Sequence, residues 1–288
     1  MIDWPEGLVN AIARRRVVVL LGSDVSASCI SNNGGRRPPT WGEFLRSAAD
    51  RCNDDRGAIR KKVASGDYLS ACELAKDSLQ EDGWRGLIRE EFVAPGYQPS
   101  DLVKAIYRLG HRITITPNFD KIYDTYASAE SQNTVLIKHY SDNDISDAVR
   151  EGQDIIIKAH GTVGSIGSMI FSRSDYIKHK KNNANFIILL ESIASTHTVL
   201  MIGCGVSDPG FALLFENCAA AHVGRPHYMT WASYRGDTKD IELMLRTRNV
   251  KCLKYRPKDG HKELVQSIIA LITLVEQKRT IMGDGQDW

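Results

Sequence analysis

The stretch Ile113-Thr114-Ile115-Thr116-Pro117-Asn118-Phe119-Asp120 decides the fold, because a short run of β-branched residues ends there in a polar cluster. Such a run predicts a buried strand, and Pro117 ends it because proline cannot donate to a strand ladder. In an open α/β sheet, ligands bind outside the carboxyl ends of the strands. We therefore expect Asn118 and Asp120 to face a crevice at this edge of the sheet.

Six further apolar runs predict strands, and helical patterns separate most of them. The run Val17–Leu21 is too continuous for a half-solvated strand and is typical of a central parallel one. The other runs cover residues 134–137, 154–158, 198–202, 227–231 and 250–255. This alternation predicts an α/β fold with a Rossmann-like, mainly parallel sheet flanked by helices.

A helical insert is expected directly after the first strand, over about residues 40–108. Thr40 and Glu43 stand at capping-box spacing and predict a helix start. No convincing strand follows up to about residue 107, whereas residues 58–65, 68–79, 84–92 and 101–107 all fit helices. With a closing helix over residues 261–275, we expect one domain over residues 1–280 and a loose tail over residues 281–288.

Composition excludes several classes of protein. The 37 Lys and Arg against 35 Asp and Glu give a net charge of +2, which predicts no direct nucleic-acid binding. The sequence has no apolar run of about 18 residues and no secretory signal, so we expect a soluble, cytoplasmic protein with no membrane contact. Its six cysteines are scattered without a Cys-x-x-Cys pair, which predicts reduced thiols and no bound metal.

Four of the predicted strands end in polar or glycine-rich clusters, at Gly22, Asn118, His160 and Gly203. Parallel strands end at the same edge of a sheet, so these clusters should converge on one crevice although they are far apart in sequence. The usual motifs of metal hydrolases, kinases and serine hydrolases do not occur. The spacing alone thus indicates a nucleotide-binding α/β protein with an Asn/His site.

Each cluster also has a structural alternative. His160 could move a proton near neutral pH or only be satisfied by the sheet end. Asn118 could hold a water or a ribose hydroxyl, or cap a turn, and Asp120 could support Asn118 or cap the next helix. Gly203 and Gly205 could admit a nucleotide or only permit a tight turn.

Six motifs stand in order along the chain. They are Gly22-Ser23-Asp24-Val25-Ser26, Pro39-Thr40-Trp41-Gly42-Glu43-Phe44-Leu45, Thr116-Pro117-Asn118-Phe119-Asp120, Lys158-Ala159-His160-Gly161, Ser172-Arg173-Ser174-Asp175-Tyr176 and Gly203-Cys204-Gly205-Val206-Ser207-Asp208-Pro209. Together they resemble the sirtuin-like (silent-information-regulator) family, specifically its prokaryotic NAD-hydrolysing antiphage-effector branch. The resemblance covers residues 17 to about 215.

The resemblance implies NAD as the substrate, with no metal. It implies that Asn118 positions the water or the nicotinamide ribose and that His160 is the catalytic base. It also implies a set of residues that hold the dinucleotide, namely Gly22, Ser23, Asp24, Ser26, Thr116, Asp120, Gly203, Gly205 and Ser207. Asp24 departs from the family pattern, because it replaces the second glycine of the phosphate loop.

The zinc-binding cysteine quartet of protein deacetylases is absent, so the resemblance implies an NAD+ glycohydrolase that releases nicotinamide and ADP-ribose. In that branch such enzymes are antiviral effectors that deplete NAD. Since the sirtuin-like region nearly fills the chain, we expect activation through a homo-oligomer or through a complex with a separately encoded sensor protein. The alternatives are a catalytically silent module that senses NAD or ADP-ribose, and a protein deacylase or ADP-ribosyltransferase.

Overall fold

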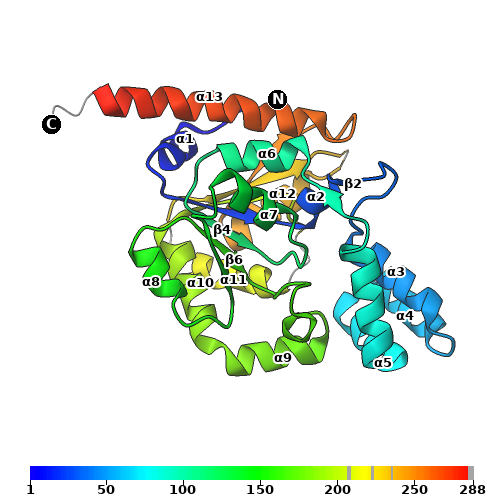
Figure 1. The fold of residues 1–288 in the computed structure, drawn as a ribbon. Coiled ribbons are helices and arrows are strands. Elements are labelled where there is room, and N and C mark those ends of the chain that lie inside the picture. The colour runs from blue at the N-terminus through cyan, green and yellow to red at the C-terminus, as the bar shows by residue number, and fades with distance from the viewer. Residues whose placement is uncertain (206–208, 222–223, 235, 285–288) are drawn as a thin grey trace.

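A seven-stranded sheet forms the centre of the molecule (Figure 1). The computed structural model describes residues 1–205, 209–221, 224–234 and 236–284, and within them the strand order is β5-β6-β4-β1-β7-β8-β9. The strands are β1 (Val17–Leu21), β4 (Ile113–Thr116), β5 (Leu136–His139), β6 (Ile155–Lys158), β7 (Thr198–Ile202), β8 (His227–Ala232) and β9 (Val250–Tyr255). All neighbours pair in parallel, so the predicted Rossmann-like fold class is confirmed.

Helices occupy most connections between the strands. They are α1 (Glu6–Ala13), α2 (Ser23–Ala27), α3 (Trp41–Arg51), α4 (Arg56–Ala64), α5 (Tyr68–Phe92), α6 (Asp101–Arg108), α7 (Ile122–Glu130), α8 (Ile145–Arg150), α9 (Arg173–Asn182), α10 (Ala184–Thr196), α11 (Pro209–Ala221), α12 (Thr238–Arg248) and α13 (Lys262–Asp284). A short 3₁₀ helix, η1, covers Ile166–Ser168.

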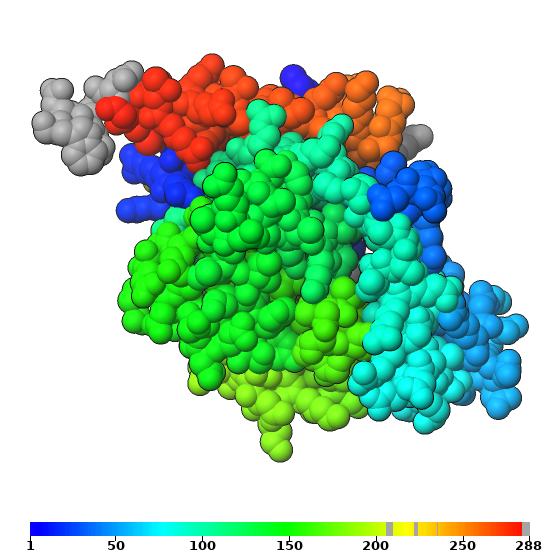
Figure 2. All heavy atoms as spheres, in the orientation of Figure 1, coloured from blue at the N-terminus to red at the C-terminus, as the bar shows by residue number. Residues whose placement is uncertain are grey.

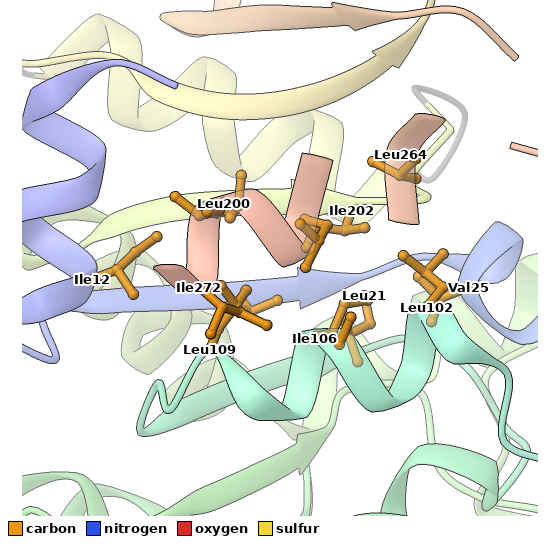
Figure 3. Close-up of a cluster of buried hydrophobic side chains, with 14 of the residues drawn as sticks. Ile12, Leu21, Val25, Leu102, Ile106, Leu109, Leu200, Ile202, Leu264 and Ile272 are labelled. Carbon is orange, nitrogen blue, oxygen red and sulfur yellow. The ribbon is translucent and has the colours of Figure 1, made fainter. Parts of the chain in front are cut away.

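The continuous apolar run of β1 is explained by burial on both of its faces. Val19 and Leu21 belong to a core with α1, α6 and α13, whereas Val18 and Leu20 belong to a second core with α8, α10 and α11. Figure 3 shows part of the first core, which contains Leu21 of β1 together with Ile106 of α6 and Ile272 of α13. Because successive side chains of a strand point to opposite faces, a strand covered on both sides must be apolar throughout.

The helices α3, α4 and α5 form a module with its own core, beside the sheet (Figures 1 and 2). Phe44, Ile59 and Leu87 are fully buried in it. The capping box of Thr40 and Glu43 is present at the start of α3, as predicted. The aromatic side chain of Phe171, which follows β6, also packs into this core and thereby joins the module to the sheet.

Two details of the predicted insert differ in the structure. The helix α6 packs against α13 and contributes Leu102 and Ile106 to the core of the sheet, so the module ends with α5 and does not extend to about residue 108. A two-residue strand, β3 (Tyr97–Gln98), pairs with β2 (Ile30–Ser31) where no strand was predicted. A pair this short has no readable periodicity, and an amphipathic helix does not reveal which core it will join.

A loose tail was predicted over residues 281–288, but α13 continues through residues 281–284, and residues 285–288 lie outside the described residues. Good helix formers follow the last fully buried turn of α13, and Arg279 ties this end to the body. Its Nη2 donates to the carbonyls of Leu109 and Gly110 at 3.2 and 3.1 Å. These contacts lie at the amino-terminal edge of β4, opposite the predicted site.

Two buried histidines predict a loss of stability in acid. Burial lowers the pKa of His111 to about 3 and that of His227 to about 4, and His227 accepts a hydrogen bond from the backbone N–H of Val199 through Nδ1. Since both values lie below the usual pKa, the unfolded chain binds protons first, and stability falls as the pH drops from about 6.5 towards 4. At pH 5 each histidine should cost about 2 kcal/mol.

The measurement is urea unfolding of the wild type, His111→Asn and His227→Asn at pH 7.5 and pH 5. Each variant should lose less stability than the wild type over this interval. An unchanged pH dependence in both variants would show that these histidines are not the cause.

Candidate active site

A cavity of about 360 Å³ lies at the carboxyl edge of the sheet, between the sheet and the helical module. The loops after β1, β4, β6 and β7 all contribute to its lining, so the four clusters meet as the topology predicts. The predicted site residues that line it are Gly22, Ser23, Asp24, Ser26, Asn118, Asp120, His160 and Gly205. Thr116 and Gly203 support these residues from behind, and Ser207 lies outside the described residues.

The side-chain amide of Asn118 is held on its nitrogen side. Its Nδ2 donates to the carbonyl oxygen of Gly22 at 2.9 Å and to Oγ of Ser26 at 3.0 Å. Its backbone N–H donates to Oγ1 of Thr116 at 3.0 Å. Both amide hydrogens are therefore used, and among the described residues no donor contacts Oδ1. The amide oxygen is the part of Asn118 that can accept from a ligand hydroxyl or a water.

Asp120 supports Asn118 and also accepts a hydrogen bond at the start of the next helix, although the N-cap of α7 is Lys121 rather than Asp120. Its Oδ2 accepts from Oγ of Ser26 at 2.6 Å, and Ser26 in turn accepts from Asn118. Its Oδ1 accepts from the backbone N–H of Ile122 at 3.0 Å, at the start of α7. Asp120 therefore orients Asn118 through Ser26 and also fixes the beginning of the helix.

His160 lies directly beyond β6 and is buried, with only 7% of its surface exposed. Its ring faces Tyr176 of α9, with 5.3 Å between the ring centroids and 3.5 Å from Nε2 to the tyrosine hydroxyl. Gly161 then turns the chain with a φ of +84°, and a Cβ atom there would lie 2.5 Å from the carbonyl oxygen of Ser168. This turn returns the chain towards the helical module immediately after the histidine.

Gly22 and Gly203 let two loops pack directly against one another. A Cβ atom on Gly22 would lie 2.1 Å from the carbonyl oxygen of Gly203. Gly203 has a φ of +62°, and a Cβ atom there would lie 2.8 Å from the backbone nitrogen of Val25. The two glycines thus set the spacing between the loops after β1 and β7, which brings Cys204 and Gly205 to the cavity.

Asp24, the departure from the family loop, is exposed in the first turn of α2. Neighbouring protein atoms raise the pKa of its carboxyl by desolvation, and the charges of His261 and Arg37 partly oppose this. The side chain of His261 is itself fixed, because its Nδ1 lies 2.7 Å from the hydroxyl oxygen of Tyr255. The Asp24 carboxyl therefore lies at the cavity, with Arg37 of the loop before α3 and His261 of the loop before α13 nearby.

The sequence analysis did not assign an aromatic wall of the cavity, which the helical module and the loops after β4 and β6 form together. Phe119 and Phe171 stack with their ring centroids 4.4 Å apart, and Trp41 lies 5.4 Å from Tyr68. All four rings line the cavity. Trp41 stands inside a quoted motif, but Phe171 is an isolated aromatic residue whose partner, Phe119, lies 52 positions earlier.

A buried lysine was also missed. Lys158, the last residue of β6, is 1% exposed, and its Nζ lies 3.0 Å from the carboxylate of Asp124 in α7. The available signal was a charged residue at the end of the apolar run Ile155–Ile157. Such a residue is rarely fully buried unless it is paired.

Further searches of the described residues concern metals and membranes. No group of three or more His, Cys, Asp or Glu side chains is arranged to hold a metal ion within these residues. Among the helices of the described part of the chain, none combines the length and the apolar character that crossing a bilayer needs.

Comparison with known proteins adds to this geometry. The family model of the SIR2-like domain matches residues 112–253, from the start of β4 into β9. A solved structure described as "Structural Basis for the Mechanism and Regulation of Sir2 Enzymes" aligns with a TM-score of 0.50 over 95% of this chain and 97% of that chain. These findings support a sirtuin-like family.

Sequence identity to that Sir2 structure is 13%, so the likeness establishes the Sir2-type fold. No curated protein matches the sequence significantly. The family model and the structural match thus agree on a similarity to SIR2-like domains and on the fold. The segment that the SIR2-like model matches contains both Asn118 and His160.

Proposed function

We propose that this protein is an NAD+ glycohydrolase that converts NAD+ and water to nicotinamide and ADP-ribose. The observation that carries the proposal is the orientation of Asn118 by Gly22 and Ser26 in the same cavity as the buried His160. An oriented amide oxygen and an imidazole suit the placement of one water and one ribose. The test is nicotinamide release from NAD by the purified protein.

The reaction requires few groups from the protein, namely one that orients a water and one that accepts its proton. The bond between ribose C1′ and the pyridinium nitrogen breaks, and its electron pair neutralises the ring nitrogen of the departing nicotinamide. A water oxygen bonds to C1′, and His160 accepts the proton that this water loses. General-base assistance of this kind is worth roughly 10²–10⁴-fold, and orientation of the water by Asn118 adds to it.

The residues that would hold the dinucleotide come from the loops after β1 and β7. Ser23 offers a hydroxyl and Gly205 presents backbone without a side chain, whereas the Ser26 hydroxyl donates to Asp120 and lines the cavity behind Asn118. Thr116 and Asp120 act behind Asn118, through its backbone N–H and through Ser26. The stacked rings of Phe119 and Phe171 form an apolar wall that limits bulk water in the cavity.

We further propose an antiviral role in which the enzyme depletes NAD after activation, as a homo-oligomer or in a complex with a separately encoded sensor. The support is the resemblance of the ordered motifs to the antiphage-effector branch. The expected result is low NAD consumption by the isolated chain and at least about a tenfold rise when co-encoded proteins are added. Full and constant activity in the isolated monomer would contradict activation by assembly or by a partner.

Asp24 favours a second candidate, a catalytically silent module that senses NAD or ADP-ribose. Its carboxylate stands in the loop that the resemblance assigns to phosphates, where it would repel a pyrophosphate. In the silent module, NAD would raise the melting temperature without turnover. Transfer of ADP-ribose to a protein, or deacylation of one, would instead change a macromolecular acceptor.

If the hydrolase proposal holds, Asp24→Asn should lower the KM for NAD about fivefold with little change in kcat. Removing a charge near the pyrophosphate relieves a repulsion of about 1 kcal/mol at close range in a water-like dielectric. Steady-state kinetics at constant ionic strength make the measurement, with Asp24→Glu as the charge-retaining control. An unchanged or increased KM in Asp24→Asn would show that this carboxylate does not face the phosphates.

A further inference from the structure

Lys158 is a charged side chain inside the sheet domain, two residues before His160. It is 1% exposed, and its partner Asp124 is 4% exposed. The ammonium makes two kinds of contact, which join three segments of the chain. Nζ lies 3.0 Å from the carboxylate of Asp124 in α7, and it donates to the backbone carbonyl of Asp120 at 2.7 Å.

The contact with the Asp120 carbonyl fixes the far end of the loop that carries Asn118. The near end of this loop is fixed by Thr116, whose Oγ1 donates to the carbonyl of Leu21 at 2.9 Å and accepts from the Asn118 backbone N–H. Between these two points, the side chain of Asp120 reaches Asn118 through Ser26. A displacement of Asp120 would therefore pass directly to the amide of Asn118.

Stability alone does not explain a buried ion pair at this position. Moving two charges out of water costs several kcal/mol per ion, and apolar replacements of similar volume are often neutral or stabilising. The space beneath the loop is small, because a second cavity of about 10 Å³ is bordered by Ser26, Asn118, Asp120, Asp124 and Lys158. The loop therefore packs over Lys158 with little free space beneath it. Loss of the contact between Lys158 and the Asp120 carbonyl would allow the loop to move.

We propose that Lys158 is a positioning residue. It holds the Asn118–Asp120 loop at a fixed distance from β6 and thereby fixes the position of the Asn118 side chain relative to His160. The inference rests on the proposed NAD hydrolysis. Lys158 lies beneath the loop and acts through the Asp120 carbonyl, while the ion pair with Asp124 orients the ammonium group. It therefore governs turnover more than the binding of NAD.

The main variant is the double substitution Lys158→Met with Asp124→Leu, which leaves no unpaired buried charge. Its kcat for nicotinamide release should fall about 100-fold, as expected when a reacting group moves by about 1 Å, while KM stays within about threefold. The matched control is Arg279→Met, because Arg279 also donates to backbone carbonyls but at the opposite edge of β4. This control should lower the melting temperature and leave kcat within about twofold.

A second readout does not depend on activity. In protein labelled with ¹⁵N-asparagine, the side-chain NH₂ signals of Asn118, assigned by their loss in Asn118→Ala, should exchange slowly with solvent in the wild type. Their exchange rate should be at least about tenfold higher in the double variant and should equal the wild-type rate in Arg279→Met. If the double variant does not fold, Lys158→Gln with Asp124→Asn replaces it, because the two amides can pair while the glutamine is too short to reach Asp120.

The outcomes separate the two proposals. Wild-type turnover with full kcat and full amide protection in the folded double variant would overturn the positioning role. Loss of both kcat and amide protection in the double variant would support the positioning role. A wild type that releases no nicotinamide would remove the hydrolase proposal, and the amide exchange would still decide whether Lys158 holds Asn118.

Discussion

Replacing Asn118 with alanine is expected to lower kcat for nicotinamide release at least about 100-fold, and His160→Ala should lower it roughly 10²–10⁴-fold. The Asn118→Ala variant loses the oriented amide oxygen that accepts a hydrogen bond from water or ribose. The His160 variant loses the base that takes the proton. Because both residues lie at the end of strands whose cores are unchanged, the variants should remain folded.

The controls are His197→Ala and Asn217→Ala, which remove the same side-chain types away from the cavity. His197 precedes β7 at the amino-terminal edge of the sheet, and Asn217 lies in α11 with its amide on Glu191. Both should retain wild-type rates. Initial rates of nicotinamide release, with melting temperatures to confirm folding, make the measurement. Wild-type turnover in Asn118→Ala or His160→Ala would remove that residue from the mechanism.

Gly22→Ala should reduce the free energy of unfolding by about 3 kcal/mol or more, because overpacking against backbone atoms cannot be relieved by a rotamer change. The new methyl group would lie 2.1 Å from the carbonyl oxygen of Gly203 and 2.4 Å from Cα of Cys204. The loops after β1 and β7 would have to separate, so NAD turnover should be lost as well.

Gly86→Ala is the matched control for this substitution. Gly86 lies within α5, and a Cβ atom there would meet no atom of another segment within 4 Å. Alanine there should be neutral or stabilise the protein by about 0.5–1 kcal/mol, since it lowers the entropy of the unfolded chain. Urea unfolding of both variants makes the comparison. Equal stability of the two would show that the loops after β1 and β7 are not in contact.

The sheet was predictable because its signals are local. The strands β1, β4, β7 and β9 have the bounds that their apolar runs predict, and each run ends at a turn former or a polar residue. The meeting of Gly22, Asn118 and His160 at one cavity follows from parallel topology, which brings the ends of distant strands to one edge.

Features that depend on contacts between distant segments were not predictable. The pairing of Lys158 with Asp124 joins positions 34 residues apart, and nothing in the local pattern names the partner. The same holds for the stacking of Phe119 on Phe171 and for the choice of α6 between two cores. The end of α13 was missed because Arg279 anchors it through backbone carbonyls, which have no sequence signature.

The central claim is that the cavity holding Asn118 and His160 adds water to C1′ of the nicotinamide ribose. The most direct measurement is mass spectrometry of the products after incubation of the protein with NAD in ¹⁸O-labelled water, with its co-encoded neighbours present. The account predicts equal amounts of nicotinamide and of ADP-ribose carrying one ¹⁸O atom. Turnover without labelled ADP-ribose, or NAD binding without any turnover, would contradict it.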